Sequence, residues 1–434
     1  MPHGTRERQR MHTGRIELPA KHGTQGDLHY VWNGKRVVAE DAFFDEKRDA
    51  HNTLQRHVQQ RFDGLKSAFF PRRELVTPDY WEYVKWRGLH RLFSSMSSIF
   101  STQSLLLAVG VGAKKTLPAA AGINWVLKDG LGRLGRLTMA TRFGESFDSD
   151  LKRFRFASSL LYGGALALDY LTPLVPGYFL PMAAVANIGK SIGLTTYIST
   201  QPAFFKSFAK SENIADITAK AQAQQMAIDT LGLALAVSLN LAVRRNAMYA
   251  RMLPLAMFPI LIPGDLYAIY HELRSVHLRT LNKERAEFVA ECFVNSGNIP
   301  TPEVVSKQER LILPPRTALG NFPLDIQSLE RSIENKSDVD AFLLPSQRKK
   351  KYFICCGSHG HVSATFRKDS STRDILQAIL TVAYMRKNPR KTVDIPAAES
   401  SAKHHVAGFM KKLKQAGWQT EPFTLSRTER MFYT

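Results

Sequence analysis

The sequence predicts a mainly α protein, with a helical core that is partly embedded in a membrane and a small C-terminal α+β domain. Three observations support this fold class. The region 91–285 is apolar and holds few acidic residues, which favours closely packed or membrane-inserted helices. Residues 346–434 show strand and helix patterns in turn. The chain has 434 residues and 44% hydrophobic content, so it is long enough for two or three cores and is not a disordered protein.

Polarity, proline content and charge divide the chain into four parts. They are an N-terminal hairpin with a polar helix (1–74), the helical core (75–295), a polar, proline-bearing linker (296–345) and a basic α+β domain (346–434). The N-terminal stretch LHYVWNGKRVV (28–38) predicts a hairpin, because Asn33-Gly34 is the preferred pair for a type I′ turn. A polar helical pattern follows from about 44 to 68.

The core opens with TPDYWEYVKWRGLHRLF (77–93), which predicts a helix capped by Thr77 with Pro78 at its first position. Charge-free stretches follow at 92–113, 170–189, 230–243 and 252–264. A membrane span needs about 20 apolar residues, and only the first two stretches reach that length. Both are interrupted, the first by serines (Ser94, Ser95, Ser97, Ser98, Ser101 and Ser104) and the second by prolines (Pro173, Pro176 and Pro181).

Serine, glycine and alanine inside apolar helices favour close packing in a bilayer, although tight soluble bundles use the same residues. We therefore expect membrane insertion, with a soluble helical core as the alternative. The next stretch, 265–295, predicts one long amphipathic helix. Six apolar residues approximate a single face of it: Leu266, Ile269, Leu273, Val276, Leu281 and Val289.

The last part of the chain predicts a small domain with the order β-β-α-α-β. KKKYFICCGSHGHVSATFRK (349–368) alternates like two strands around Gly357–Gly360, and EPFTLSRTERMF (421–432) suggests a last strand. Two helices are expected between them, at about 372–387 and 401–416.

The charge of the chain is strongly positive, with 59 Lys and Arg against 38 Asp and Glu, or +21. Residues 346–434 hold 17 of these basic residues and only 6 acidic ones. Such a module suggests an anionic lipid surface or a protein partner. Nucleic acid is not the expected partner, because aromatic residues are not interleaved with the basic runs. Three cysteines make no disulfide framework and the first residues lack an apolar signal core, so we expect an intracellular membrane and leave the organelle open.

Three glycines, Gly130, Gly132 and Gly135, have the spacing G-x-G-x-x-G of a dinucleotide-binding turn. Such a turn needs a preceding strand, βαβ surroundings and an acidic residue about 20 positions further on, and the sequence supplies none of these clearly. We therefore interpret the glycines as positions of close helix contact. ANIGKS (186–191) resembles the end of a P-loop, but Ala184 stands where that loop needs glycine, so we reject it.

Other polar groups give weaker signals. CCGSHGH (355–361) offers two sulfurs and two imidazoles, but adjacent cysteines point to opposite faces of a strand, so an ordinary hairpin is preferred to a metal site. Asp169 and Asp229 lie inside apolar stretches, where a carboxylate needs a partner. We favour ion pairs between helices over a ligand site for both. The cations considered for them are Lys128, Arg133, Arg136, Arg153 and Lys190.

Five blocks of the chain, in order, are similar to the root UVB sensitive family. They are NWVLKDGLGRLGRL (124–137), FDSDLKRFRFASSLLYGGALALDYLTPLVP (147–176), ANIGKS (186–191), ENIADITAK (212–220) and VHLRTLNKER (276–285). The resemblance covers roughly 75–290. Ala221 and Glu212 depart from the family pattern, which often has Asp and Asn at those places. The resemblance implies a membrane-associated protein. Plant members of the family are linked to seedling development, auxin transport and vitamin B6 status, and no catalytic reaction is established for it.

Together these observations predict a non-enzymatic, membrane-associated protein with a scaffolding or small-molecule transport or homeostasis role. No catalytic residue, cofactor or metal ligand is assigned. Ligand-binding candidates are Lys128, Asp129, Arg136, Asp148, Asp150, Asn187, Lys190, Asp216 and Lys220, with Asp169 as a further member of the polar lining. The partner of the basic domain is lipid or a protein, for which another member of the same family is one candidate. The alternative is a soluble ligand-binding protein or cofactor-dependent enzyme that uses Gly130, Gly132 and Gly135.

Overall fold

The computed structural model of the chain is mainly helical and divides into two compact units, 1–67 and 68–434. It describes residues 16–21, 28–32, 37–41, 64, 66–110, 150–312, 322–344, 347, 350–357, 360–387, 394–426, 429 and 432–433.

Three antiparallel strands lie in the N-terminal unit: β1 (Ile16–Lys21), β2 (Leu28–Trp32) and β3 (Val37–Asp41). β2 and β3 pair with Trp32 opposite Val37, so the predicted hairpin is confirmed. β1 pairs with the other edge of β2 and was not predicted. Nearly all of the helix expected at 44–68 lies outside the described residues.

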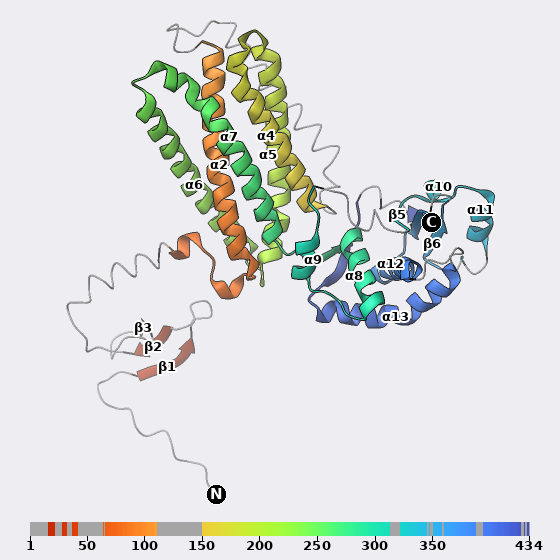
Figure 1. Ribbon diagram of the computed structural model, residues 1–434. Coiled ribbons are helices and arrows are strands. Elements are labelled where there is room, and N and C mark those ends of the chain that lie inside the picture. The colour runs from red at the N-terminus through yellow and green to blue at the C-terminus, as the bar shows by residue number, and fades with distance from the viewer. Residues whose placement is uncertain are drawn as a thin grey trace. The chain divides into compact units, whose positions relative to one another are not determined.

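Five long helices form a bundle in the second unit (Figure 1). They are α2 (Asp79–Ala108), α4 (Leu151–Leu171), α5 (Phe179–Phe208), α6 (Ile214–Val243) and α7 (Ala247–Ser275), with two short 3-10 turns, η4 (Thr172–Leu174) and η5 (Pro176–Tyr178), between α4 and α5. α2 is the central element, because it packs against α7, α6 and α4, while α5 packs mainly against α4.

The predicted first helix of the core is confirmed and extends to Ala108, but its expected cap is wrong. Pro78 precedes the first helical residue, and no side chain caps the helix. The Thr77 hydroxyl is buried without a hydrogen-bond partner among the described residues. At the start of the helix the Thr77 carbonyl accepts the backbone N–H of Tyr80 at 3.2 Å.

The two helices long and apolar enough to cross a membrane, among the described residues, are α6 and α7. The sequence predicts membrane spans at 92–113 and 170–189 instead, because the apolar stretches 230–243 and 252–264 are too short on their own. The structure extends these short stretches into helices of 30 and 29 residues. The apolar window of α6 is only 11% buried, so this helix presents most of its hydrophobic surface outward.

The stretch ANIGKS lies inside α5 and forms no anion-wrapping loop. Gly189 and Gly193 allow α5 to approach α4 closely. A Cβ on Gly189 would lie 2.9 Å from the Cβ of Ala165, and one on Gly193 would lie 2.9 Å from that of Tyr162. Glycines four residues apart that face a neighbouring helix are typical of close packing in membrane bundles.

The single amphipathic helix expected at 265–295 is wrong. α7 ends at Ser275 and α8 (Lys283–Ser296) begins after an extended stretch that contains β4 (Thr280–Asn282). β4 pairs in parallel with β8 (Gln419–Thr424), and the Asn282 side chain caps α8 by accepting the backbone N–H of Arg285. The apolar pattern is real but spans two helices and a strand, so its residues enter two different cores.

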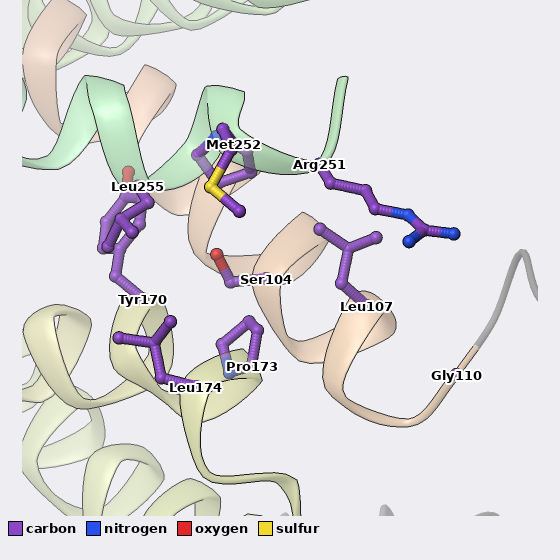
Figure 2. Close-up of a pocket in the computed structure, with 10 residues that line it drawn as sticks. Ser104, Leu107, Gly110, Tyr170, Pro173, Leu174, Arg251, Met252 and Leu255 are labelled. Atoms are coloured by element: carbon purple, nitrogen blue, oxygen red, sulfur yellow. The ribbon is translucent and has the colours of Figure 1, made fainter. Parts of the chain in front are cut away.

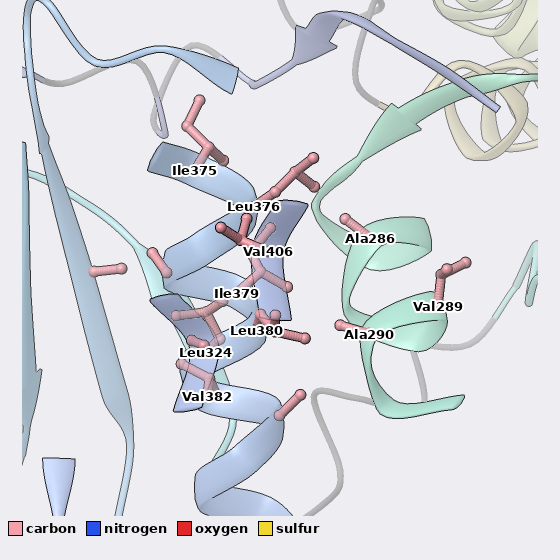
Figure 3. Packing of buried hydrophobic residues seen from close by; sticks show 14 of the residues in the cluster. Ala286, Val289, Ala290, Leu324, Ile375, Leu376, Ile379, Leu380, Val382 and Val406 are labelled. Atoms are coloured by element: carbon pink, nitrogen blue, oxygen red, sulfur yellow. The ribbon is translucent and has the colours of Figure 1, made fainter. Parts of the chain in front are cut away.

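The C-terminal region packs helices against two small sheets. β6 (Tyr352–Cys356) and β7 (Val362–Arg367) form an antiparallel hairpin, and β5 (Leu324–Ile326) and β9 (Phe432–Tyr433) pair with β7 in parallel. α12 (Thr372–Lys387) and α13 (Ile395–Gln415) follow the hairpin and precede β8, so the predicted order is confirmed. Figure 3 shows the shared core, to which α12 contributes Leu376 and Ile379 and α8 contributes Ala286 and Ala290.

The stretch 296–345, expected to be a linker, carries structure of its own. It contains α9 (Pro302–Gln308), α10 (Leu329–Ser332) and α11 (Lys336–Leu343), and it also supplies β5 to the C-terminal sheet. The four domain boundaries drawn from the sequence stay predictions.

Candidate functional site

One face of α2 is both polar and buried over nearly its whole length. Its members alternate three and four residues apart, the spacing that keeps side chains on one side of a helix. They are Tyr83, Arg87, His90, Ser94, Ser97, Ser101 and Ser104. At 1.5 Å per residue, this face extends about 32 Å along the helix. We call this face, with the polar groups of α4, α5 and α7 next to it, the polar seam.

Polar residues on the neighbouring helices repeat in step with α2. Arg155, Tyr162 and Asp169 lie seven residues apart on α4, and Asp265 and Glu272 lie seven residues apart on α7. Seven residues are two helical turns, so these groups meet α2 in layers about 10 Å apart. Because α2 is surrounded by the other helices, the layers lie inside the bundle rather than on its surface.

The first layer holds a buried ion pair between α4 and α5. Asp169 is fully buried, and its Oδ2 atom lies 2.5 Å from Nζ of Lys190. The same oxygen accepts a hydrogen bond from Ser101 at 2.6 Å. Its Oδ1 atom has no hydrogen-bond partner among the described residues. Beside it, the Tyr170 hydroxyl donates to the carbonyl of Ser97 at 3.1 Å.

The middle layer is built around a histidine and a carboxylate. His90 of α2 and Asp265 of α7 are both buried, and Nδ1 of the ring lies 2.8 Å from Oδ1 of the carboxylate. The two atoms are close, but neither makes a hydrogen bond among the described residues.

Two buried arginines define the third layer. Nη2 of Arg87 donates to the Tyr197 hydroxyl at 3.3 Å and to Oε1 of Gln225 at 3.2 Å. The guanidinium carbon of Arg155 lies 4.1 Å from the centre of the Tyr197 ring, a cation–π contact. Glu272 is 1% exposed, and its Oε2 atom has no hydrogen-bond partner among the described residues.

A pocket of about 400 Å³ lies at the Ser104 end of the polar seam (Figure 2). Figure 2 shows Ser104 and Leu107 of α2 opposite Pro173 and Leu174, with Met252 of α7 on a third side. The pocket wall is mainly apolar, and Tyr170, the neighbour of Asp169, also lines it. The first layer of the seam is therefore close to an open pocket.

A cluster of ionic groups lies at the start of α4 and holds α8 and α9 to the bundle. Lys152 is buried and lies 2.7 Å from Oε2 of Glu309, while its Nζ also donates to Ser306 at 2.7 Å. Arg285 of α8 pairs with the other oxygen of Glu309. Burial alone raises the pKa of Glu309, but Arg285 and Lys152 outweigh it and lower that pKa to about 2.

The described residues predicted as ligand-binding lie at three places in the bundle. Lys190 lies in the polar seam, and Asn187 is one turn before it on α5. Asp216 and Lys220 pair with each other at 2.9 Å in the first turns of α6. Asp150 lies 3.5 Å from Arg153 at the start of α4. Lys128, Asp129, Arg136 and Asp148 lie outside the described residues, as do Gly130, Gly132 and Gly135.

Both carboxylates noted in apolar stretches form ion pairs between helices, as favoured from the sequence. Asp169 pairs with Lys190, one of the cations considered for it. Asp229 of α6 pairs with Arg91 of α2 at 2.5 Å, and Arg91 was not among those cations.

Sequence reasoning missed the polar seam itself. The serines of α2 were counted as interruptions of an apolar stretch, and Arg87 and His90 were not considered. The signal was present: from Tyr83 to Ser104 the polar positions are separated by 4, 3, 4, 3, 4 and 3 residues. Other polar residues stand between these positions, so the spacing alone does not show that the face is buried. They are Lys85, Arg91, Ser95, Ser98, Thr102 and Gln103.

These features define a class of protein: a helical bundle with an apolar exterior and a charged interior, joined to a C-terminal α+β region. The chain belongs to the root UVB sensitive family. Residues 55–297 match the family model described as the vitamin B6 photo-protection and homoeostasis domain.

Several curated proteins resemble the chain over most of its length. It is 31% identical to Protein root UVB sensitive 4 of Arabidopsis thaliana over 85% of this chain and 76% of that protein. It is 33% identical to Protein root UVB sensitive 6 of the same plant over 70% of this chain and 59% of that protein. RUS family member 1 of Dictyostelium discoideum is 28% identical over 62% of this chain and 51% of that protein. No solved structure matches the chain.

Proposed function

We propose that this protein is a membrane-embedded carrier, without enzymatic activity, that binds a small polar molecule along the polar seam and moves it across the bilayer. The observation that carries the proposal is the length of the seam. Its α2 face is about 32 Å long, and the hydrocarbon core of a bilayer is about 30 Å thick. Polar side chains at that depth are costly and usually line a pathway for a substrate or an ion.

The outer surface of the bundle supports membrane embedding. Large apolar side chains are exposed along α5 and α6, among them Ile198, Leu233 and Leu241, each more than half exposed. Similar side chains continue on α7, including Ile260. Water disfavours a continuous apolar surface of this kind, whereas lipid chains cover it without cost.

The family description gives the first candidate for the transported molecule. The matching domain is named for vitamin B6 homoeostasis, so we propose a vitamin B6 compound as substrate and a role in its distribution. Asp169, His90, Asp265 and Glu272 would contact its polar groups through the seam. An intracellular membrane is the proposed location, with the basic C-terminal region near anionic lipid or a partner protein.

Uptake into vesicles tests this function. We expect liposomes that contain the purified full chain to take up labelled pyridoxine faster than protein-free liposomes. Asp265→Asn removes the charge of the middle layer while keeping its shape, so uptake should fall at least about tenfold. Glu303→Gln is the matched control, because this carboxylate is 57% exposed and lies on α9, outside the seam. Wild-type uptake equal to that of protein-free liposomes would contradict the carrier.

A further inference from the structure

We propose that Arg87 and Arg155 form an anion-binding site inside the bundle, which takes an oxyanion group, a carboxylate or phosphate. The inference deepens the proposed function by adding an anion subsite to the third layer of the seam. Pyridoxine has no carboxylate or phosphate, so binding at this subsite is independent of pyridoxine uptake. The anion site can nevertheless be tested without any transport measurement.

The two guanidinium groups contact the same side chain, that of Tyr197. Arg87 reaches the hydroxyl of Tyr197, and Arg155 stacks on its ring at 4.1 Å. Arg87 is 2% exposed and Arg155 is 4% exposed. Two positive charges are therefore held close together and away from water. In this buried position the like charges repel each other and each has lost its hydration.

The charges of this layer do not balance among the described residues. In the first layer the charge of Asp169 has a direct partner in Lys190. In the middle layer Asp265 lies against the His90 ring. In the third layer the single carboxylate near the two arginines is Glu272, which acts on Arg87 electrostatically but forms no ion pair with either guanidinium among the described residues. One more negative charge would make the layer neutral, so a monoanion fits better than a dianion.

Donor atoms for such a group are already in place. Nε of Arg87 and Nη2 of Arg155 are buried, and neither has a hydrogen-bond partner among the described residues. A guanidinium presents its N–H groups in a planar fork that matches the oxygens of a carboxylate or phosphate. Buried donors of this kind are normally satisfied, so their grouping around one tyrosine indicates a ligand position.

A groove is lined by residues of α2 and α6 that neighbour this layer in sequence. This groove of about 640 Å³ follows the contact between α2 and α6 and is lined by Val84, Gly88 and Ile228. Val84 and Gly88 lie within one turn of Arg87, and Ile228 lies within one turn of Gln225, which accepts from Arg87. α6 thus lies between the anion site and the groove. Most of the apolar surface of this helix is exposed.

Thermal unfolding of the full chain in detergent tests the anion site. The probes are sodium benzoate and sodium phosphate, each compared with sodium chloride at equal ionic strength. We expect at least one of them to raise the unfolding midpoint of the wild type, because a ligand that binds only the folded state stabilises it. Response to benzoate alone identifies a carboxylate site, and response to phosphate identifies a phosphate site.

Substitutions separate this site from general attraction of anions to a basic protein. Arg87→Gln and Arg155→Gln should weaken the response at least about tenfold in apparent Kd, and Lys411→Gln should keep it, since Lys411 is an exposed residue of α13. Arg155→Lys, which keeps the charge and loses the fork, should weaken it as well and carries the test if the glutamine variants do not fold.

Equal responses in the wild type and all variants, or no response of the wild type to either anion, would overturn the site. Pyridoxine uptake is an independent result. Uptake without anion binding would leave the carrier and reject this site, while anion binding without uptake would leave the site and reject the carrier.

Discussion

Asp169 of α4 and Lys190 of α5 form an ion pair at 2.5 Å with the carboxylate fully buried. Asp169 also accepts the Ser101 hydroxyl from α2, so one carboxylate joins three helices. The pair fixes the relative position of these helices at the end of the polar seam that is close to the pocket.

Breaking this pair from one side should be much more costly than removing both charges. Lys190→Met leaves a buried, unpaired carboxylate, and we expect a loss of about 3–5 kcal/mol in the free energy of unfolding. Asp169→Leu combined with Lys190→Met should recover most of that loss. Lys220→Met is the control, because its partner Asp216 is well exposed, and it should cost less than about 1 kcal/mol. If the double variant lost as much stability as the sum of the losses for Asp169→Leu and Lys190→Met measured separately, the pairing would be contradicted.

The contact between α4 and α5 should tolerate no side chain at Gly193. A Cβ there would lie 2.9 Å from the Cβ of Tyr162 and 3.1 Å from the carbonyl oxygen of Ser158. We expect Gly193→Ala to lower the free energy of unfolding by about 1–3 kcal/mol through overpacking. Gly164→Ala on α4 meets nothing within 4 Å and should stabilise the helix by up to about 1 kcal/mol. Unfolding in detergent distinguishes the two, and equal effects would argue against close packing.

Glu309 should make stability depend on pH in the acid range. Its pKa is lowered from 4.5 to about 2 in the folded chain by Arg285 and Lys152, against the opposing effect of burial. A lowered carboxylate pKa stabilises the fold above pH 4.5, and this contribution is lost as pH falls from 4.5 toward 2. It amounts to roughly 3 kcal/mol, at 1.36 kcal/mol per pKa unit.

Glu309→Gln should therefore unfold more easily at pH 7 and show a flatter stability profile between pH 4.5 and 2. Glu303→Gln is a suitable comparison, because Glu303 lies on α9 close by in sequence and is exposed. A profile for Glu309→Gln as steep as that of the wild type would show that Glu309 does not cause the acid loss.

Arg386 should be essential for the attachment of α12 to α8. Its guanidinium lies 2.7 Å from Glu287 and 2.5 Å from Glu291, and it also donates to the carbonyl of Phe322. Burial raises the pKa of Glu287 and Arg386 lowers it, so removal of the arginine should raise that pKa further.

We expect Arg386→Met to lower the free energy of unfolding by about 3–5 kcal/mol, because Glu287 is left buried without its partner. Arg373→Met changes an exposed arginine on the same helix and should have little effect. A loss equal to that of Arg373→Met would mean that the pair with Glu287 contributes nothing measurable.

Local patterns allowed much of the fold to be predicted. The hairpin at 28–38 depends on its turn residues, and the β-β-α-α-β order after residue 349 depends on alternation and helical periodicity, which are properties of neighbouring residues. The helix expected at 265–295 failed for a different reason. β4 exists because β8, more than 130 residues later, pairs with it, and a distant partner leaves no mark on local periodicity.

The candidate site was less predictable for the same reason. Charge inside an apolar stretch pointed correctly to Asp169 and Lys190, because a buried carboxylate requires a cation. The layer of Arg87, Arg155 and Glu272 brings together α2, α4 and α7, and only the packing of the bundle reveals it. The regular polar spacing on α2 was visible in the sequence, yet its burial was not.

Membrane extraction tests most directly whether the bundle, with the polar seam inside it, is embedded in lipid. Cells that express the full chain are lysed, and their membranes are washed with high salt and then with alkaline carbonate before ultracentrifugation. Embedding of α6 and α7 predicts that the chain stays in the pellet after both washes and enters solution only with detergent. Release into the supernatant by either wash would contradict a membrane-embedded carrier.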